Sequence, residues 1–131
     1  MPANVRPLYG YQGSQVKVTN NSGGALEEGD GVYFSSGTMT EVGDSNTVGI
    51  DGVLAADLAN GDTGIMWTDG VFEVSAASAY NGAQGDAVYT ASASTVDGGT
   101  SSDKSVGYIT KEDPAASAVL EIKLCSRLKT V

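Results

Sequence analysis

The sequence predicts an all-β protein, a small β-barrel or sandwich of about nine or ten short strands. Glycine, with 18 residues, and the small or β-branched residues Ser, Thr, Ala and Val dominate the 131-residue chain, which has only two Phe and one Trp. This composition favours short strands and many turns over long helices. No segment repeats apolar residues at helical spacing, and turn-forming residues interrupt the chain at short intervals.

A short pattern that occurs twice predicts an internal structural duplication. Residues 29–33 read Gly-Asp-Gly-Val-Tyr and, 56 positions later, residues 85–89 read Gly-Asp-Ala-Val-Tyr. Downstream, Thr-Val-Gly-Ile at 47–50 is matched by Ser-Val-Gly-Tyr at 105–108. A repeat of this length indicates one supersecondary unit used twice around a common core. Before each strand, glycine permits a positive φ and the Asp carboxylate can accept backbone N–H groups.

The chain divides near residue 14 into an arm and a domain. Residues 1–14 contain two prolines and show neither helical nor strand periodicity, which predicts an extended N-terminal arm. The apolar side chains of this arm are costly to leave in water, so it either docks on a neighbouring molecule or folds back on its own barrel. Residues 15–131 are expected to form a single β-barrel-like domain, with repeat-like units at about 26–75 and 82–125.

Alternating apolar and polar residues between turn signals locate the strands. The expected strands lie at 15–19, 31–35, 38–42, 47–55, 63–67, 71–74, 86–90, 106–110 and 118–124. Asp69-Gly70 is a two-residue hairpin signal that should turn the strand at 63–67 directly into the next one. The stretch 91–105, rich in Ser, Ala, Thr and Gly, predicts a loop or a weak hairpin.

The charge of the chain is large and unevenly placed. The net charge is −9, which argues against nucleic acid as a direct partner because phosphate binding needs clustered Lys and Arg. All sixteen carboxylates lie between Glu27 and Glu121, whereas the two ends carry five cations and no acid. Either the basic ends meet an acidic surface while the acidic body stays soluble, or the few cations are placed by chance.

The single cysteine and the chain start give simple expectations about compartment. Cys125 cannot form an intramolecular disulfide, and its place at the end of an apolar strand predicts a buried structural thiol. The first residues lack the apolar core of a signal peptide, and no apolar run approaches the length of a membrane span. We therefore expect synthesis in a cytoplasm and no membrane partner.

Several kinds of catalytic chemistry have no candidate residues. The chain has no histidine, which excludes a Ser-His-Asp triad, a Cys-His pair and histidine-based zinc sites. Neither the phosphate-binding P-loop pattern nor Gly-x-Gly-x-x-Gly occurs. Asp51, Asp57 and Asp62 could supply oxygen ligands for calcium, but their spacing matches no standard loop. The sequence thus predicts a binding or structural protein with no cofactor, no metal and no enzymatic activity.

The order of several short motifs resembles one known family. An alternating first strand and an Asn/Gly-rich turn precede the first Gly-Asp-x-Val-Tyr. Val-Gly-Ile-Asp-Gly-Val, Thr-Asp-Gly-Val-Phe-Glu-Val, a second Gly-Asp-Ala-Val-Tyr, Val-Gly-Tyr-Ile and Val-Leu-Glu-Ile-Lys-Leu follow in that order. Over about residues 15–125 this series resembles the small capsid cement, or head decoration, proteins of tailed bacteriophages.

The resemblance implies a β-barrel-like virion protein, made in the bacterial host cytoplasm, that binds the outer surface of the phage head. Many copies, often as homotrimers, would bridge major capsid protein subunits after the shell expands and so stabilise the head. On the N-terminal arm, Leu8, Tyr9 and Tyr11 are the candidate apolar anchors and Arg6 a charged contact. The alternative is a virion surface module that binds host glycans, with calcium held by Asp51, Asp57 and Asp62.

Overall fold

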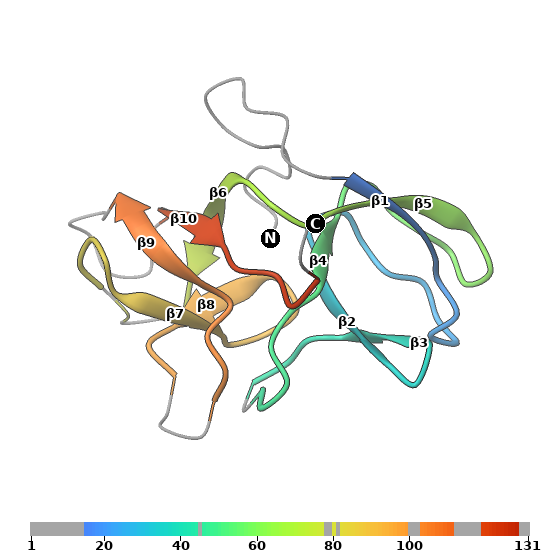
Figure 1. Ribbon diagram of the computed structural model, residues 1–131, viewed down its shortest axis with the longest axis horizontal. Coiled ribbons are helices and arrows are strands. Elements are labelled where there is room, and N and C mark those ends of the chain that lie inside the picture. The colour runs from blue at the N-terminus through green and yellow to red at the C-terminus, as the bar shows by residue number, and fades with distance from the viewer. Residues whose placement is uncertain are drawn as a thin grey trace.

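The computed structural model describes residues 15–44, 46–77, 80, 82–99, 103–111 and 119–128. These residues form ten strands in two groups, and the described part of the chain contains no helix that could span a bilayer. Figure 1 shows a five-stranded sheet on the right and a closed barrel on the left. The all-β prediction and the number of strands are confirmed. The predicted arm at residues 1–14 lies outside the described residues.

The five-stranded sheet is antiparallel and uses the first half of the chain, in the spatial order β1-β5-β4-β2-β3. Its central strand β4 pairs with β2 and β5, which leaves β1 and β3 at the two edges. Its strands are β1 (Gln15–Thr19), β2 (Gly31–Ser35), β3 (Thr38–Glu41), β4 (Gly52–Leu54) and β5 (Thr63–Trp67).

The barrel uses the second half of the chain, in the order β10-β6-β8-β7-β9. All its strand pairs are antiparallel except β6 and β8, which run parallel. The loop or weak hairpin expected at 91–105 contains β8, which pairs antiparallel with β7. The strands are β6 (Val71–Ala76), β7 (Ala87–Thr90), β8 (Thr95–Asp97), β9 (Gly107–Lys111) and β10 (Val119–Leu124).

The two Gly-Asp patterns form the same turn in the two halves. Gly29 and Gly85 have φ values of 88° and 91°. In the first turn, Asp30 Oδ2 accepts the N–H of Glu27 at 2.9 Å, and in the second Asp86 Oδ2 accepts the N–H of Ala83 at 3.0 Å. Positive φ is cheap only for glycine, and a carboxylate that accepts a local N–H closes the turn. The repeated motif is therefore a turn that starts β2 and β7.

The second half of the repeat has a different alignment from the one the sequence indicates. Gly52 pairs with Val32 and Gly107 pairs with Val88, so Gly52, and not Gly49, is the equivalent of Gly107. A Cβ on Gly52 would meet the Met66 side chain, and one on Gly107 would meet a backbone carbonyl of β10. Both glycines thus sit where a neighbouring strand approaches too closely for any side chain.

The long strand expected at 47–55 is only three residues long in the structure. Asn46 holds the preceding residues in a loop: its Nδ2 donates to Gly49 O at 2.8 Å, and its Oδ1 accepts the N–H groups of Val48 and Gly49. Gly49 has a φ of 105°, outside the strand region. An asparagine that satisfies the local backbone competes with strand pairing, which explains the late start of β4.

The hairpin predicted at Asp69-Gly70 is wrong. β5 pairs with β1 and β4, and β6 pairs with β8 and β10 in the other group. Both strands already have a partner on each side, so they have no free edge with which to pair. Gly70, with a φ of 130° and its N–H bound to Asp69 Oδ1, instead redirects the chain from the sheet into the barrel.

Two hydrophobic clusters hold the molecule together. One fills the barrel and extends to one face of the sheet, where it includes Ile50, Val53 and Trp67. The other covers the opposite face of the sheet and includes Met39, Leu54 and Met66. Successive strand residues point to opposite faces, so Val53 and Leu54 belong to different clusters. The sheet therefore contributes to both clusters and joins the two halves.

Candidate functional site

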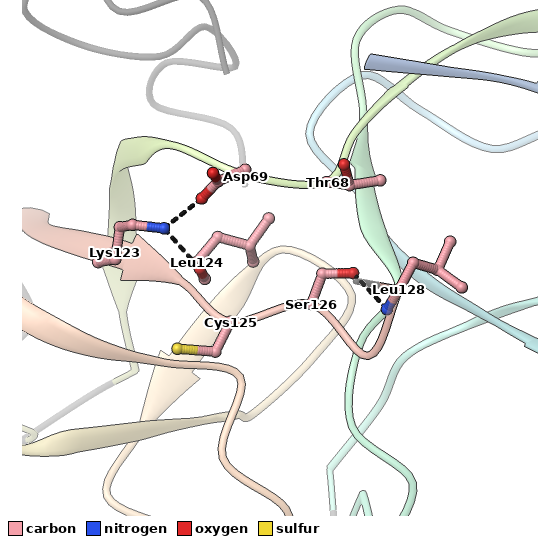
Figure 2. A pocket seen from close by; sticks show the side chains of 7 residues that line it. All are labelled: Thr68, Asp69, Lys123, Leu124, Cys125, Ser126 and Leu128. Atoms are coloured by element: carbon pink, nitrogen blue, oxygen red, sulfur yellow. Dashed lines mark hydrogen bonds and ion pairs between the residues drawn. The ribbon is translucent and has the colours of Figure 1, made fainter. Parts of the chain in front are cut away.

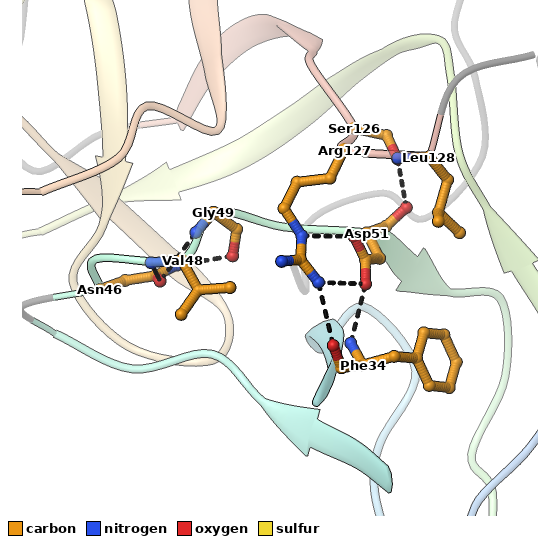
Figure 3. Close-up of polar contacts among 8 residues, drawn as sticks. All are labelled: Phe34, Asn46, Val48, Gly49, Asp51, Ser126, Arg127 and Leu128. Atoms are coloured by element: carbon orange, nitrogen blue, oxygen red, sulfur yellow. Dashed lines mark hydrogen bonds and ion pairs between the residues drawn. The ribbon is translucent and has the colours of Figure 1, made fainter. Parts of the chain in front are cut away.

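The last described residues, 125–128, cross from the barrel to the five-stranded sheet, and we call them the C-terminal latch. Figure 3 shows that Arg127 and Ser126 of the latch form hydrogen bonds with Asp51, which precedes β4. Arg127 Nε and Nη2 donate to the two oxygens of the Asp51 carboxylate, each at 2.8 Å. Ser126 Oγ donates to Asp51 O at 2.6 Å, and Arg127 N donates to Ile50 O at 2.8 Å.

The Asp51 carboxylate is buried and fully used inside the protein. Only 1% of its side chain is exposed, and Oδ2 also accepts the N–H of Phe34 at 2.7 Å. The Arg127 guanidinium lies 5.9 Å from the centre of the Tyr33 ring, and its hydrogen bond to Asp51 raises the pKa of Arg127. A buried carboxylate needs this bidentate partner, because an unpaired charge away from water is costly.

A cleft of 440 Å³ lies where the latch leaves the barrel (Figure 2). Asp69 and Lys123 form an ion pair on its wall. Burial alone would lower the pKa of Lys123, but the hydrogen bond and the charge of Asp69 outweigh it and raise that pKa. The lining residues are Thr68, Asp69, Lys123, Leu124, Cys125, Ser126 and Leu128.

Cys125 is exposed in this cleft, so the prediction of a buried thiol is wrong. On β10, Leu120, Ile122 and Leu124 point into the barrel and are buried. Because successive side chains alternate, the residue after Leu124 points outward. The apolar strand was predicted correctly, but its even-numbered side chains point into the barrel, so Cys125 faces solvent.

Two carboxyl groups come together at the end of β3. Desolvation by burial, then a hydrogen bond and the charge of Asp30, raise the pKa of Glu41. Asp30 is buried and belongs to the turn before β2, and Glu41 pairs with Val32 across the strands. The N–H of Glu27 already binds one Asp30 oxygen. A neighbouring carboxylate disfavours the ionised form of Glu41 and so adds to the effect of burial.

The predicted contact residues have different outcomes. Arg6, Leu8, Tyr9 and Tyr11 lie outside the described residues. Of the C-terminal cations, Lys123 and Arg127 bind Asp69 and Asp51 of their own chain. These two cations therefore bind carboxylates within their own chain, and contact of the basic ends with an acidic surface stays a prediction.

The three aspartates considered for calcium do not form a site. Asp51 is bound by the latch, and Asp57 Oδ1 accepts the N–H of Glu28 at 2.9 Å. Asp62 N donates to Ala59 O at 3.0 Å in a separate turn. Within the described ranges, no group of three acidic or cysteine side chains could hold a metal ion. The calcium-dependent version of the glycan-binding alternative thus loses its ligands.

Sequence reasoning missed the latch entirely. Arg127 and Asp51 are 76 positions apart, and only the folded chain brings them together. One signal was available: Asp51 follows Ile50, which is fully buried, and a charged residue beside a core position needs a partner. The position of Asp51 therefore predicts that a cationic side chain binds it, but does not identify which Lys or Arg that is.

A small set of large apolar side chains remains exposed for contact with other molecules. Val16 and Ile65 lie on the neighbouring strands β1 and β5 and are 38% and 39% exposed. The others, on the barrel and the latch, are Tyr108, Val119 and Leu128. Scattered exposed apolar residues are ordinary, so a binding surface must be argued from more than exposure.

Comparisons with known proteins agree with this architecture. A family model described as phage cement protein matches residues 11–124. Among solved structures, the N base of head fiber gp8.5 in bacteriophage phi29 has the same fold, with a TM-score of 0.58 and 17% sequence identity. The match covers 89% of this chain and 100% of that one. A search of curated proteins found no significant match. The chain belongs to the phage cement protein family and is a capsid-associated structural protein of a phage virion.

Proposed function

We propose that the protein binds the outer surface of the expanded phage head and stabilises the shell by bridging neighbouring subunits of the major capsid protein. The observation that carries this proposal is the family match, which covers residues 11–124 and so includes both the sheet and the barrel. The head fiber base that shares the fold is also a component of a phage head. The role is structural rather than enzymatic.

The internal construction suits a protein that must transmit force. A cement protein can bridge subunits only if the body between its contacts does not yield. Here a closed barrel and a sheet share a hydrophobic cluster, and the C-terminal latch adds an ion pair between them whose carboxylate is buried. Local opening has a low cost where few buried contacts hold a region, and the shared cluster and the latch both oppose separation of the two halves.

We expect the bound form to be a homotrimer. The first contact of a trimer with the shell raises the effective concentration of its other two contacts, so weak individual contacts sum to stable attachment. In the N-terminal arm, Leu8, Tyr9 and Tyr11 are proposed as apolar anchors and Arg6 as a charged contact. The net charge of −9 keeps free copies apart in solution.

The proposal is tested by co-sedimentation of the purified protein with unexpanded and expanded shells of its phage. We expect saturable binding to expanded shells and weaker or no binding before expansion, with a stoichiometry that reports the lattice site. Equal binding to both forms would contradict the expansion step. Absence of binding to either would contradict the function, and a glycan screen would then test the surface-module alternative.

A further inference from the structure

The described strands leave one sheet edge more open than the other. The five barrel strands close on themselves, so the barrel has no edge. In the five-stranded sheet, the edges are β1 and β3. At β3, the outward N–H of Met39 donates to Asn21 Oδ1 at 2.8 Å, and Asn21 Nδ2 donates to Gly37 O at 3.0 Å. The side chain of Asn21 thus occupies part of the β3 edge, which leaves β1 as the more open edge of the described structure.

The direction of the β1 backbone groups follows from its neighbours. Asn20 N donates to Asp62 O, and Ala55 N donates to Ile65 O, so residues of even number on β1 face β5. Backbone groups alternate in direction along an antiparallel strand. The N–H and C=O groups of Gln15, Lys17 and Thr19 therefore point away from the sheet, and no backbone bond joins them to the other described residues.

The side chains beside this edge favour association. Val16 and Ile65, which flank the edge on opposite faces of the sheet, are each more than a third exposed. Lys17 lies opposite Ile65 and is exposed. An extended strand added here would gain backbone hydrogen bonds, one apolar contact on each face and a cation at its centre. Natural proteins usually block such an edge unless a partner covers it.

A second copy of the chain is a poor occupant of the edge. Two β1 strands that paired antiparallel over their full length would place Lys17 opposite Lys17 of the other copy. Like charges directly opposite one another destabilise a strand pair. The edge instead suits a strand that places a carboxylate opposite Lys17.

We propose that the β1 edge pairs with an extended segment of the major capsid protein that carries an acidic residue opposite Lys17. The partner is taken from the proposed function, on which this inference rests. The segment adds a sixth strand to the sheet, hydrogen-bonded to Gln15, Lys17 and Thr19 and packed beside Val16 and Ile65. The five-stranded sheet of this protein would thereby be extended by a strand of the capsid protein.

Two variants at one position separate the backbone bond from the charge. Lys17→Pro removes the outward N–H without removing a bond to β5, since edge strands tolerate proline at such positions. Lys17→Ala removes the charged side chain beyond Cβ but keeps the backbone N–H. In co-sedimentation with expanded heads, we expect Lys17→Ala to weaken binding about threefold and to reduce its salt dependence. We expect Lys17→Pro to weaken binding about tenfold or more.

A photocrosslinker identifies the occupant even if the proline variant fails to fold. A benzophenone amino acid replaces Lys17, and a matched control carries it at Thr38 on the partly covered β3 edge. We expect illumination on expanded heads to join position 17, and not position 38, to the capsid protein. Crosslinks to another copy or to residues 1–14 of this chain would overturn the inference, as would full binding of a folded Lys17→Pro. Failure of the unchanged protein to bind heads would instead overturn the proposed function.

Discussion

Arg127 stands close to the end of the chain, yet it satisfies a carboxylate in the interior. Its two hydrogen bonds to Asp51, each 2.8 Å long, form a bidentate pair whose carboxylate side is 1% exposed. Removing Arg127 would take the charged partner from a buried carboxylate that would still accept the N–H of Phe34. At the residue scale, the latch is thus one polar link between the two halves, in addition to the hydrophobic cluster that they share.

The variant Arg127→Ala should lose about 1–3 kcal/mol of unfolding free energy, because the buried Asp51 carboxylate loses both guanidinium hydrogen bonds and keeps the N–H of Phe34. Urea unfolding followed by tryptophan fluorescence measures this loss through Trp67. Arg127→Lys keeps a charge but not the bidentate geometry and should fall between the two proteins. The neighbouring Leu128→Ala, on an exposed side chain, is the matched control and should change little. A loss for Arg127→Ala no larger than that of Leu128→Ala would contradict the role of the latch.

Glu41 makes stability depend on pH in a defined direction. Desolvation and Asp30 raise its pKa in the folded protein, so the folded state binds this proton more tightly than the unfolded state does. The stabilisation is full below the pKa of unfolded Glu and is lost as the pH rises through the raised value. At pH 7 the ionised pair is a net cost.

Glu41→Gln removes this cost and should stabilise the protein at pH 7 by about 0.5 kcal/mol, since solvent screens a partly exposed group. At pH 4 the gain should shrink or vanish. Thermal unfolding at the two pH values measures the difference, with Glu28→Gln as a surface control. An equal effect of Glu41→Gln at both pH values would show that the carboxyl pair is not responsible.

At the element scale, the glycines of the repeat mark where strands approach most closely. Gly52 of β4 and Gly107 of β9 hold equivalent places, and a Cβ on either would collide with the adjacent strand. Beside Gly52, the carbonyl oxygen of Trp67 would lie 2.6 Å from the added atom. Backbone cannot move aside as a flexible side chain can, so these positions tolerate no side chain.

Gly52→Ala and Gly107→Ala should each destabilise the protein by about 1–3 kcal/mol through overpacking. Gly24→Ala is the control, because a Cβ there meets nothing within 4 Å. Chemical denaturation of the three variants gives the comparison. Should Gly107→Ala and Gly24→Ala prove equally stable, the repeat would not depend on close strand approach.

Local patterns predicted most strands, and pairing between distant strands decided the rest. The alternation at 15–19 and 31–35 corresponds to β1 and β2 with the same bounds, because alternation alone defines a half-buried strand. Asp69-Gly70 has the composition of a hairpin turn, yet β5 and β6 belong to different groups. Which strands have a free edge is a property of the whole fold, and turn residues do not encode it.

The same limit applied to the candidate site. The composition predicted a structural or binding protein, and the order of the motifs identified the family, which the family match confirms. Asp51 was considered only as a calcium ligand, since its partner Arg127 is 76 positions away. Cys125 was predicted to be buried, but the buried position at the end of β10 is Leu124, and the next side chain faces solvent. A contact between residues far apart in the sequence can be identified only from the folded structure. The same holds for the direction in which a side chain points at the end of a strand.

At the scale of the whole molecule, deletion of residues 1–14 tests the proposed arm. The sheet, the barrel and the latch are built from residues after this segment, so we expect the shortened protein to unfold at the same urea concentration as the full chain. Its affinity for expanded heads should fall about tenfold or more if the aromatic anchors of the arm are buried at the interface. A quadruple Ala variant of Arg6, Leu8, Tyr9 and Tyr11 should reproduce the loss. Unchanged binding by both variants would exclude the arm as an anchor.

The central claim is that the protein strengthens the phage head, and DNA retention measures this directly. Packaged, expanded heads that lack the protein are heated with and without added purified protein, and the release of DNA is followed with an intercalating dye. We predict release at a higher temperature when the protein is added, saturating at the stoichiometry found by co-sedimentation. Release at the same temperature, with the protein demonstrably bound, would show that it decorates the head without cementing it.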